Sequence, residues 1–320
     1  MKLLETKINN LKLSSPLMTA SGTSGHSDEI EILQKSNEIL SSLGAFVTKG
    51  VTLKPSKGNP EPRYVETRCG IINSIGLQNS GVKLFVQNEL PPLVKFKLPI
   101  IVNISASTVK EFGEVAEFLS NNDSMKIVSG IEINVSCPNI KEGGVAFGTD
   151  PRQVEGIVKT VKKRIDSRIV VITKLTPNVT DITIPARAAI EGGTDALSMI
   201  NTLRGMAIDI HARQPQPFLG NKTGGLSGPA IKPVGVFMVY ECFRKIPECK
   251  KRKIPIIGIG GISAWQDAME YIMAGATAVG IGTAWFVSPD VFKKVYNGIK
   301  QYVNKQNGKV SDFIGKANAE

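Results

Sequence analysis

One cysteine lies in a setting that could support acid–base chemistry. Cys137 is part of Asn134-Val-Ser-Cys-Pro-Asn139, where polar residues follow directly on an apolar run. A free cysteine is often just a small buried hydrophobic residue, but a thiolate, with an ordinary pKa of about 8.5, can also act as a general base. The chain has 2 histidines, His26 and His211, and neither is near Cys137 in sequence, so a Cys–His nucleophile pair has little support.

Two lysines stand at the ends of apolar runs. Lys49 ends the run 45–49, and Lys174 ends the run 169–174. A lysine in an enclosed site can neutralise a developing anion or hold a carboxylate. Schiff-base formation is the competing interpretation.

Several asparagines accompany these residues, namely Asn73, Asn134, Asn139 and Asn201. A single asparagine is usually a turn residue. The amide group both donates and accepts hydrogen bonds, so a set of four suits a neutral heterocycle with C=O and N–H edges. The set therefore indicates a uracil-like ligand.

Glycines mark two further sites late in the chain. Gly260-Gly261 precedes a helix that we expect Ser263 to cap, with Gln266 as its capping-box partner, and Gly282-Thr283 ends another apolar run. Glycines allow a close approach of backbone N–H groups to a ligand, and a helix N-terminus favours an anion. The alternative is that these glycines serve only tight turns. The pair of motifs predicts a phosphate-bearing ligand.

The elements that would position these residues are short apolar runs alternating with helix-like segments. Eight runs lack the polar–apolar alternation of half-exposed strands, which indicates strands covered on both faces. They span residues 17–20, 45–49, 100–104, 131–135, 169–174, 196–200, 255–259 and 278–281. The alternation predicts a (β/α)8 barrel, with an open doubly wound sheet as the other candidate.

Helix ends and insertions complete this expected architecture. Asp150 with Pro151 is typical of a helix start, and so is Asp290. Segments 50–98 and 202–230 exceed ordinary connections, and we expect them to form the walls of the site at the carboxyl ends of the strands. Residues 1–320 are expected to form one domain.

Composition limits the function classes. Hydrophobic residues make up 42% of the 320 residues, which excludes a disordered chain. The 4 cysteines lack zinc-site spacing, so we expect no metal. No signal peptide or apolar span is recognised, so we expect a cytoplasmic protein that does not enter a membrane. The net charge of +11 is spread along the chain, which favours a solvated or partner-facing surface over a nucleic-acid site.

Taken together, the motifs resemble those of dihydroorotate dehydrogenases, from about residue 3 to residue 287. The resemblance is carried by the following segments: Asn73-Ser-Ile-Gly-Leu-Gln-Asn79, Asn134–Asn139, Lys174-Leu-Thr-Pro-Asn-Val-Thr-Asp181, Asn201-Thr202, Thr223-Gly-Gly-Leu-Ser-Gly-Pro229 and the two late glycine motifs. The catalytic subunits of class 1B are the most similar branch, because of Asn139-Ile-Lys-Glu-Gly-Gly144. A catalytic cysteine without an N-terminal extension also fits class 1, whereas class 2 enzymes use serine.

The resemblance implies an FMN-containing barrel that oxidises dihydroorotate to orotate in pyrimidine biosynthesis. Cys137 would remove the C5 proton, and Lys174 would stabilise the reduced flavin near N1. The substrate would contact Lys49, Asn73, Ser74, Ile75, Gly76, Leu77, Asn134, Asn139, Asn201 and Thr202. FMN would contact Ser21, Gly22, Lys49, Gly50, Asn103, Asn134, Lys174, Ile200, Gly228, Gly260, Gly261, Gly282 and Thr283.

Class 1B also implies an electron-transfer subunit that carries FAD and a 2Fe–2S cluster and passes electrons to NAD+. The assembly would be a heterotetramer built on a homodimer of this chain. The dispersed cysteines of this chain do not suit a cluster.

Three other functions match the sequence less well. A dihydropyrimidine dehydrogenase-like subunit shares several motifs but usually has histidine where this chain has Asn139. A tRNA-dihydrouridine synthase would need an added RNA-binding domain. A barrel that only binds a metabolite does not explain the set of Cys137, Lys49 and Lys174.

Overall fold

Eight parallel strands form a barrel at the centre of the molecule. The computed structural model describes residues 3–25, 37–121, 126–136, 138–139 and 145–318. The strands follow one another around the barrel in chain order, and a parallel bridge between Met18 and Ala45 joins the first to the second. They are β3 (Leu17–Thr19), β4 (Phe46–Val47), β7 (Ile100–Ile104), β8 (Val128–Asn134), β11 (Val170–Lys174), β12 (Ala196–Met199), β17 (Ile256–Ile259) and β18 (Ala276–Ile281). The predicted (β/α)8 fold is confirmed, and each of the eight apolar runs overlaps a barrel strand.

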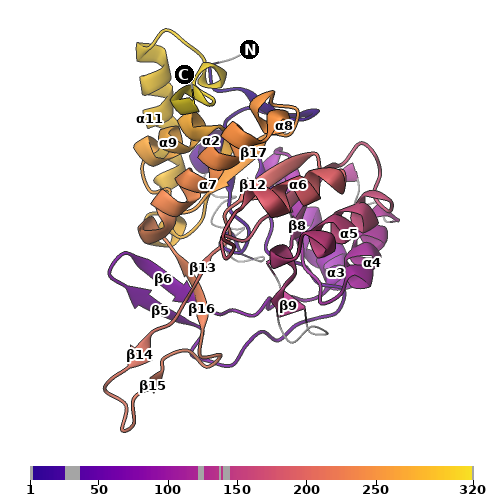
Figure 1. The fold of residues 1–320 in the computed structure, drawn as a ribbon. Helices are drawn as coiled ribbons and strands as arrows, with labels where there is room; N and C mark the ends of the chain where they lie inside the picture. The colour runs from indigo at the N-terminus through magenta and orange to yellow at the C-terminus, as the bar shows by residue number, and fades with distance from the viewer. Residues whose placement is uncertain (1–2, 26–36, 122–125, 137, 140–144, 319–320) are drawn as a thin grey trace.

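Helices surround the barrel (Figure 1). The longer ones are α2 (Asn37–Ser42), α4 (Val109–Ser120), α5 (Pro151–Lys162), α6 (Thr183–Glu191), α7 (Lys232–Lys245), α9 (Trp265–Ala274) and α11 (Val291–Lys305). The short ones are α3 (Val82–Leu84), α8 (Pro247–Lys250) and α10 (Ala284–Val287). Helix α5 shows the pattern: Val154, Ile157, Val158 and Val161 are buried at the spacing of one helix face.

Side chains of each strand alternate between two apolar clusters. Ile100 and Val102 of β7 belong to the large cluster between strands and helices, whereas Ile101 belongs to a smaller cluster inside the barrel. Ile172 and Ala196 fill the interior in the same way. This period of two determines which residues further along each strand face the barrel axis.

A hairpin covers the end of the barrel where the strands begin. It consists of β1 (Thr6–Ile8) and β2 (Leu11–Leu13), and Ile8 and Leu13 join the interior cluster. This end of the barrel is therefore packed with apolar side chains, which leaves the opposite end for polar groups.

The predicted helix starts are partly right. Asp150 caps α5 by accepting a hydrogen bond from Arg152 N at 2.9 Å, and Asp290 directly precedes α11. The predicted cap at Ser263 with Gln266 is one residue early, because α9 begins at Trp265 and its N-cap is Ala264. Asp267 is the capping residue, and it accepts hydrogen bonds from Ser263 N and Ala264 N at 2.9 and 2.8 Å.

The two long insertions share one sheet. Insertion 50–98 supplies β5 (Tyr64–Thr67) and β6 (Gly70–Asn73), and insertion 202–230 supplies β13 (Leu203–Gly205) and β16 (Gly224–Ser227). Their order is β13-β16-β6-β5. Figure 1 shows this sheet beside the barrel, with the pair β14 (Ile208–Asp209) and β15 (Gln216–Pro217) projecting beyond it. A last antiparallel pair joins β9 (Pro138–Asn139) and β10 (Val145–Ala146).

Candidate functional site at the carboxyl ends of the strands

A polar layer lies inside the barrel above the apolar interior. Asn103, Glu132, Lys174 and Ser198 come from β7, β8, β11 and β12, and all four are buried. Asn103 follows Ile101 by two residues, and Lys174 follows Ile172 by two, so the strand alternation directs both toward the axis. Four neighbouring strands thus contribute hydrogen-bonding or charged groups at one level.

Lys174 is held at the centre of this layer. Its ammonium donates a hydrogen bond to Ser21 Oγ at 2.7 Å, and it lies 3.9 Å from Glu132 Oε1. The two charged side chains are 4% and 3% exposed. Charged groups this deeply buried need a partner of opposite charge, so Lys174 and Glu132 form a buried ion pair.

Glu132 was not among the predicted site residues. Asn103 Nδ2 donates to its Oε1 at 2.7 Å, and Ser198 Oγ donates to its Oε2 at 2.8 Å. The sequence held one signal for it, because a carboxylate between the apolar residues Ile131 and Ile133 has no ordinary structural reason. The prediction named Asn134, two residues further along the same run, and not Glu132.

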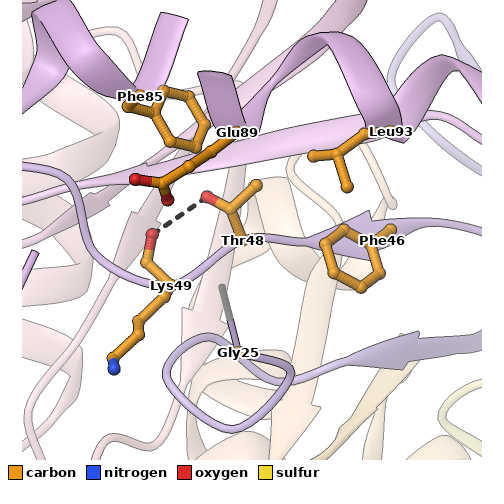
Figure 2. Close-up of a pocket in the computed structure, with 7 residues that line it drawn as sticks. All are labelled: Gly25, Phe46, Thr48, Lys49, Phe85, Glu89 and Leu93. Atoms are coloured by element: carbon orange, nitrogen blue, oxygen red, sulfur yellow. Dashed lines mark hydrogen bonds between the residues drawn. The ribbon is translucent and has the colours of Figure 1, made fainter. Parts of the chain in front are cut away.

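Lys49 lies just beyond β4 on the opposite side of the strand from Thr48. Thr48 and Phe46 line a small pocket together with Gly25, Lys49, Phe85, Glu89 and Leu93. Phe46, Phe85 and Leu93 belong to the cluster outside the barrel. Figure 2 shows the Lys49 side chain leaving this pocket, with its ammonium turned away from the other labelled side chains. The alternation therefore places Lys49 on the inner side with Val47.

The segment from Asn73 to Leu77 is held in one conformation by its neighbours. Asn59 Nδ2 donates to Ser74 Oγ at 2.8 Å, and Asn59 N donates to Ile75 O at 3.0 Å. Gly76 and Leu77 have φ values of +74° and +56°, which few leucines adopt. The Leu77 carbonyl accepts a hydrogen bond from Asn79 Nδ2 at 2.7 Å.

Arg63 holds the same segment from outside. Its guanidinium donates to Asn59 O at 2.7 Å and to Gln78 Oε1 at 2.7 Å. Asn79 Oδ1 accepts hydrogen bonds from Gly81 N and Thr52 N at 2.8 and 3.2 Å. This network gives the segment a fixed shape without any bound molecule.

The four-stranded sheet β13-β16-β6-β5, which we call the rim sheet, brings Asn73 close to Thr202. Asn73 Nδ2 donates to Gly225 O at 3.2 Å, and a Cβ at Gly225 would lie 1.9 Å from Thr202 Oγ1. Asn201 N donates to Leu175 O at 3.0 Å, just beyond Lys174. Predicted site residues from both insertions therefore lie together beyond the carboxyl end of β11.

Asn134 lies at the end of β8. Its Oδ1 accepts a hydrogen bond from Ser136 N at 3.1 Å, so the chain turns directly after the strand. Cys137 and the side chain of Asn139 lie outside the described residues.

Three glycine-containing turns converge on another part of the rim. A Cβ at Gly261 would lie 2.8 Å from Gly228 O, and Thr283 Oγ1 donates to Ser227 Oγ at 2.8 Å. A Cβ at Gly260 would lie 3.4 Å from Ile200 Cγ1. The late glycine motifs thus lie beside Gly228, as expected of one binding site.

The two residues directly before α9 offer no free N–H groups to the glycine cradle, the group of turns at Gly228, Gly260-Gly261 and Gly282-Thr283. Asp267 occupies the N–H groups of Ser263 and Ala264, and Lys232 Nζ donates to its Oδ1 at 2.9 Å. Burial raises the pKa of Asp267, but the hydrogen bonds from Lys232, Ser263 and Ala264 outweigh it and lower the pKa overall. The N–H groups of Ser263 and Ala264 are therefore already engaged, and the phosphate hypothesis rests on the glycine turns.

The cradle and the polar layer are compatible with the flavin mononucleotide that the sequence predicts. Gly22 has a φ of +90°, and a Cβ there would meet no atom within 4 Å. Ser105 Oγ is buried at the end of β7 and has no hydrogen-bond partner among the described residues. Open space beside Ser21, an unsatisfied buried hydroxyl and a glycine cradle are features that a bound polar cofactor would use.

A substitution at the cradle tests this fit. Gly261→Ala is expected to destabilise the apoprotein by about 1–3 kcal/mol and to weaken FMN binding, because φ is +68° and the new methyl group meets Gly228 O. Gly156→Ala is the matched control, since that helical position is open and alanine favours helix by roughly 1 kcal/mol. Urea denaturation and quenching of flavin fluorescence measure both effects. Similar behaviour of the two variants would contradict this account of the cradle.

The fold and the site define a (β/α)8-barrel enzyme whose active site lies at the carboxyl ends of the strands. Across the described part of the chain, no helix is long and apolar enough to cross a membrane, and no three His, Cys, Asp or Glu side chains form a group that could hold a metal ion.

The chain belongs to the dihydroorotate dehydrogenase family. The family model described as "Dihydroorotate dehydrogenase" matches residues 3–303. A relative from Thermoanaerobacter sp. (strain X514) is 49% identical over 98% of both chains. A relative from Geobacter sp. (strain M21) is 46% identical over 98% of this chain and 97% of its own. Both are named "Dihydroorotate dehydrogenase B (NAD(+)), catalytic subunit".

Proposed function

We propose that this chain is the catalytic subunit of an NAD+-linked dihydroorotate dehydrogenase and oxidises (S)-dihydroorotate to orotate in pyrimidine biosynthesis. Its relatives of the same length carry that name. The observation that carries the proposal is the buried ammonium of Lys174, held by Ser21 and facing Glu132 in a barrel of this family. A site with a fixed positive charge suits a reaction in which negative charge develops.

We assign FMN to this chain as its cofactor, which accepts a hydride when it is bound. The residues proposed to hold its ring are Ser21, Gly22, Lys49, Gly50, Asn103, Asn134 and Lys174, and those proposed to hold its ribityl phosphate side are Ile200, Gly228, Gly260, Gly261, Gly282 and Thr283. The buried polar layer and the glycine cradle support this division.

The chain's own residues divide the work of the reaction. Cys137 removes the proton from C5 of dihydroorotate, and a hydride leaves C6, so a C5=C6 double bond forms. Lys174 keeps a positive charge at a fixed position throughout. Lys49 and the Asn73–Leu77 segment hold the substrate carboxylate and ring edges, together with Asn134, Asn139, Asn201 and Thr202. The hydrogen bonds that fix Ser74 and Leu77 support a preformed substrate surface.

The assembly is a separate part of the proposal. The relatives' names describe a catalytic subunit, which implies a partner subunit. We assign FAD and a 2Fe–2S cluster to that partner. We further propose that this chain forms a homodimer and that the homodimer is part of a cytoplasmic heterotetramer. Cys242 and Cys249 of this chain are buried, and Cys69 is exposed, so the described cysteines are not arranged to bind a cluster. Residues 1–320 then form one FMN-binding domain, which the shared sheet of the two insertions supports.

An anaerobic titration tests the proposal. The purified protein is expected to contain FMN, and dihydroorotate is expected to bleach the flavin absorbance, whereas dihydrouracil and tRNA leave it unchanged. NAD+ added to the reduced catalytic subunit alone, after orotate has been removed, should restore the flavin absorbance slowly. A co-purified partner subunit should accelerate this reoxidation. A protein that cannot be loaded with FMN, or one bleached by dihydrouracil instead, would reject the assignment.

A further inference from the structure

The carboxylate of Glu132 is buried beneath the proposed flavin site and fully engaged. The residue is 2% exposed, and it lies between Ile131 and Ile133, whose side chains face the outer cluster. Oε1 accepts from Asn103 Nδ2 at 2.7 Å, and Oε2 accepts from Ser198 Oγ at 2.8 Å. Two neutral donors from two other strands thus fix the position of this charge.

The contact between Glu132 and Lys174 is an ion pair, whereas the contacts of Glu132 with Asn103 and Ser198 are hydrogen bonds. Glu132 Oε1 and Lys174 Nζ are 3.9 Å apart, which is within ion-pair range but too long for a hydrogen bond. The ammonium has three donors, and among the described side chains the one that it reaches at hydrogen-bond distance is Ser21 Oγ. Glu132 therefore offsets the charge of Lys174 without occupying its N–H groups.

Glu132 also determines how Asn103 is oriented. A carboxylate can only accept hydrogen bonds, so the Asn103 NH2 group, which donates them, must face Glu132. The Asn103 Oδ1 acceptor is then directed elsewhere, and it lies 3.1 Å from where a Cβ at Gly50 would be. The side-chain acceptor of Asn103 is thereby presented at the edge of the proposed flavin site.

We propose that Glu132 is a positioning residue that holds Asn103 and Lys174 for the flavin and lowers its midpoint potential by offsetting the Lys174 charge. This inference rests on the proposed function, because it assumes that FMN binds above this layer. Removing the negative charge would leave Lys174 uncompensated, and an uncompensated cation favours the reduced, anionic flavin.

The test removes the negative charge of Glu132 while keeping the size and shape of its side chain. Glu132→Gln is expected to raise the midpoint potential of bound FMN and to tighten sulfite addition to the flavin on the order of tenfold, the size of effect that accompanies a one-unit pKa shift. Glu132→Asp keeps the charge but withdraws it by one methylene group, so its potential should rise by less. An unchanged potential and sulfite affinity in Glu132→Gln would overturn the proposal.

Two controls separate the charge from structure. Ser198→Ala removes a hydrogen bond to Glu132 and no charge, so it should lower thermal stability with little change in potential. Glu117→Gln removes an exposed charge on α4 and should change neither quantity. If Glu132→Gln does not fold, the potential of Glu132→Asp decides, and a wild-type value there would also overturn the proposal.

Failure of this inference is distinguishable from failure of the proposed function. Sulfite and redox titrations need FMN but no dihydroorotate. Wild-type protein that binds FMN and is bleached by dihydroorotate, while Glu132→Gln keeps the wild-type potential, would reject only the role of Glu132. Wild-type protein that binds no flavin would reject the proposed function itself.

Discussion

Replacing Cys137 with alanine is expected to leave FMN bound and to slow dihydroorotate oxidation by about 10²–10⁴-fold, the usual loss when a general base is removed. The residue follows Ser136, whose backbone N–H is held by Asn134 directly after β8. In sequence, position 137 follows the last residue of the fourth barrel strand by three residues, and barrel enzymes carry catalytic groups after the ends of their strands. The proton at C5 then has no nearby acceptor in the variant.

Stopped-flow measurement of flavin reduction by dihydroorotate checks this result, with flavin absorbance as the measure of occupancy. Cys69→Ala is the matched control, because Cys69 is exposed in the turn between β5 and β6 and no site role is assigned to it. Cys242→Ala is a poorer control, since burial raises the pKa of that thiol and its removal leaves a cavity. Reduction of the Cys137→Ala flavin within a fewfold of the wild-type rate would exclude Cys137 as the base.

Replacing Lys174 with methionine is expected to cause two separate losses. The turnover number should fall by about 10²–10³-fold, because a fixed positive charge near the reacting groups is removed. The apoprotein should also lose about 3–5 kcal/mol of stability, because Glu132 would remain as a buried, unpaired charge. Methionine keeps the length of the side chain, so the charge is the main change.

A double-variant cycle separates these two losses. Lys174→Met combined with Glu132→Gln should recover part of the stability but none of the turnover, because the pair is removed while the catalytic charge stays absent. Lys162→Met is the control for a partly exposed pair, and its bridge to Asp195 should be worth about 1 kcal/mol or less. Urea denaturation measures the stabilities. Strictly additive losses in the double variant would contradict the buried ion pair.

The barrel strands could be predicted because each is covered on both faces. The runs that became β7, β11 and β17 consist almost wholly of apolar residues, and burial in a parallel sheet is the ordinary cause of such runs. The run 100–104 has the same bounds as β7, and the runs for β11 and β17 begin one residue early, whereas the run 131–135 begins three residues after the start of β8.

The rim sheet could not be predicted for a different physical reason. Strand β6 pairs with β16 across about 150 residues, as in Asn73 with Gly225. Such pairing depends on the closed barrel to bring the insertions together, and no local pattern in either insertion specifies it. Burial of a charge, as in Glu132, is likewise decided by contacts from other strands.

The N-cap of a helix could be predicted where one residue alone could cap it, and was missed where two residues could. Asp150 before Pro151 has a single reasonable position, and α5 begins there. After Gly261, both Ser263 and Asp267 can satisfy the first N–H groups of the helix. The carboxylate forms charge-assisted hydrogen bonds and also reaches Lys232, so it prevails over the hydroxyl of Ser263.

The shared sheet of the two insertions also limits how this site can change during evolution. Asn73 reaches Gly225, and Thr202 packs against the same glycine, so one insertion presents its proposed substrate residues only with the other in place. Exchanging a single insertion with that of a distant barrel would break the pairing of β6 with β16. The two segments therefore depend on each other for their conformation, and we expect a change in one to need a matched change in the other.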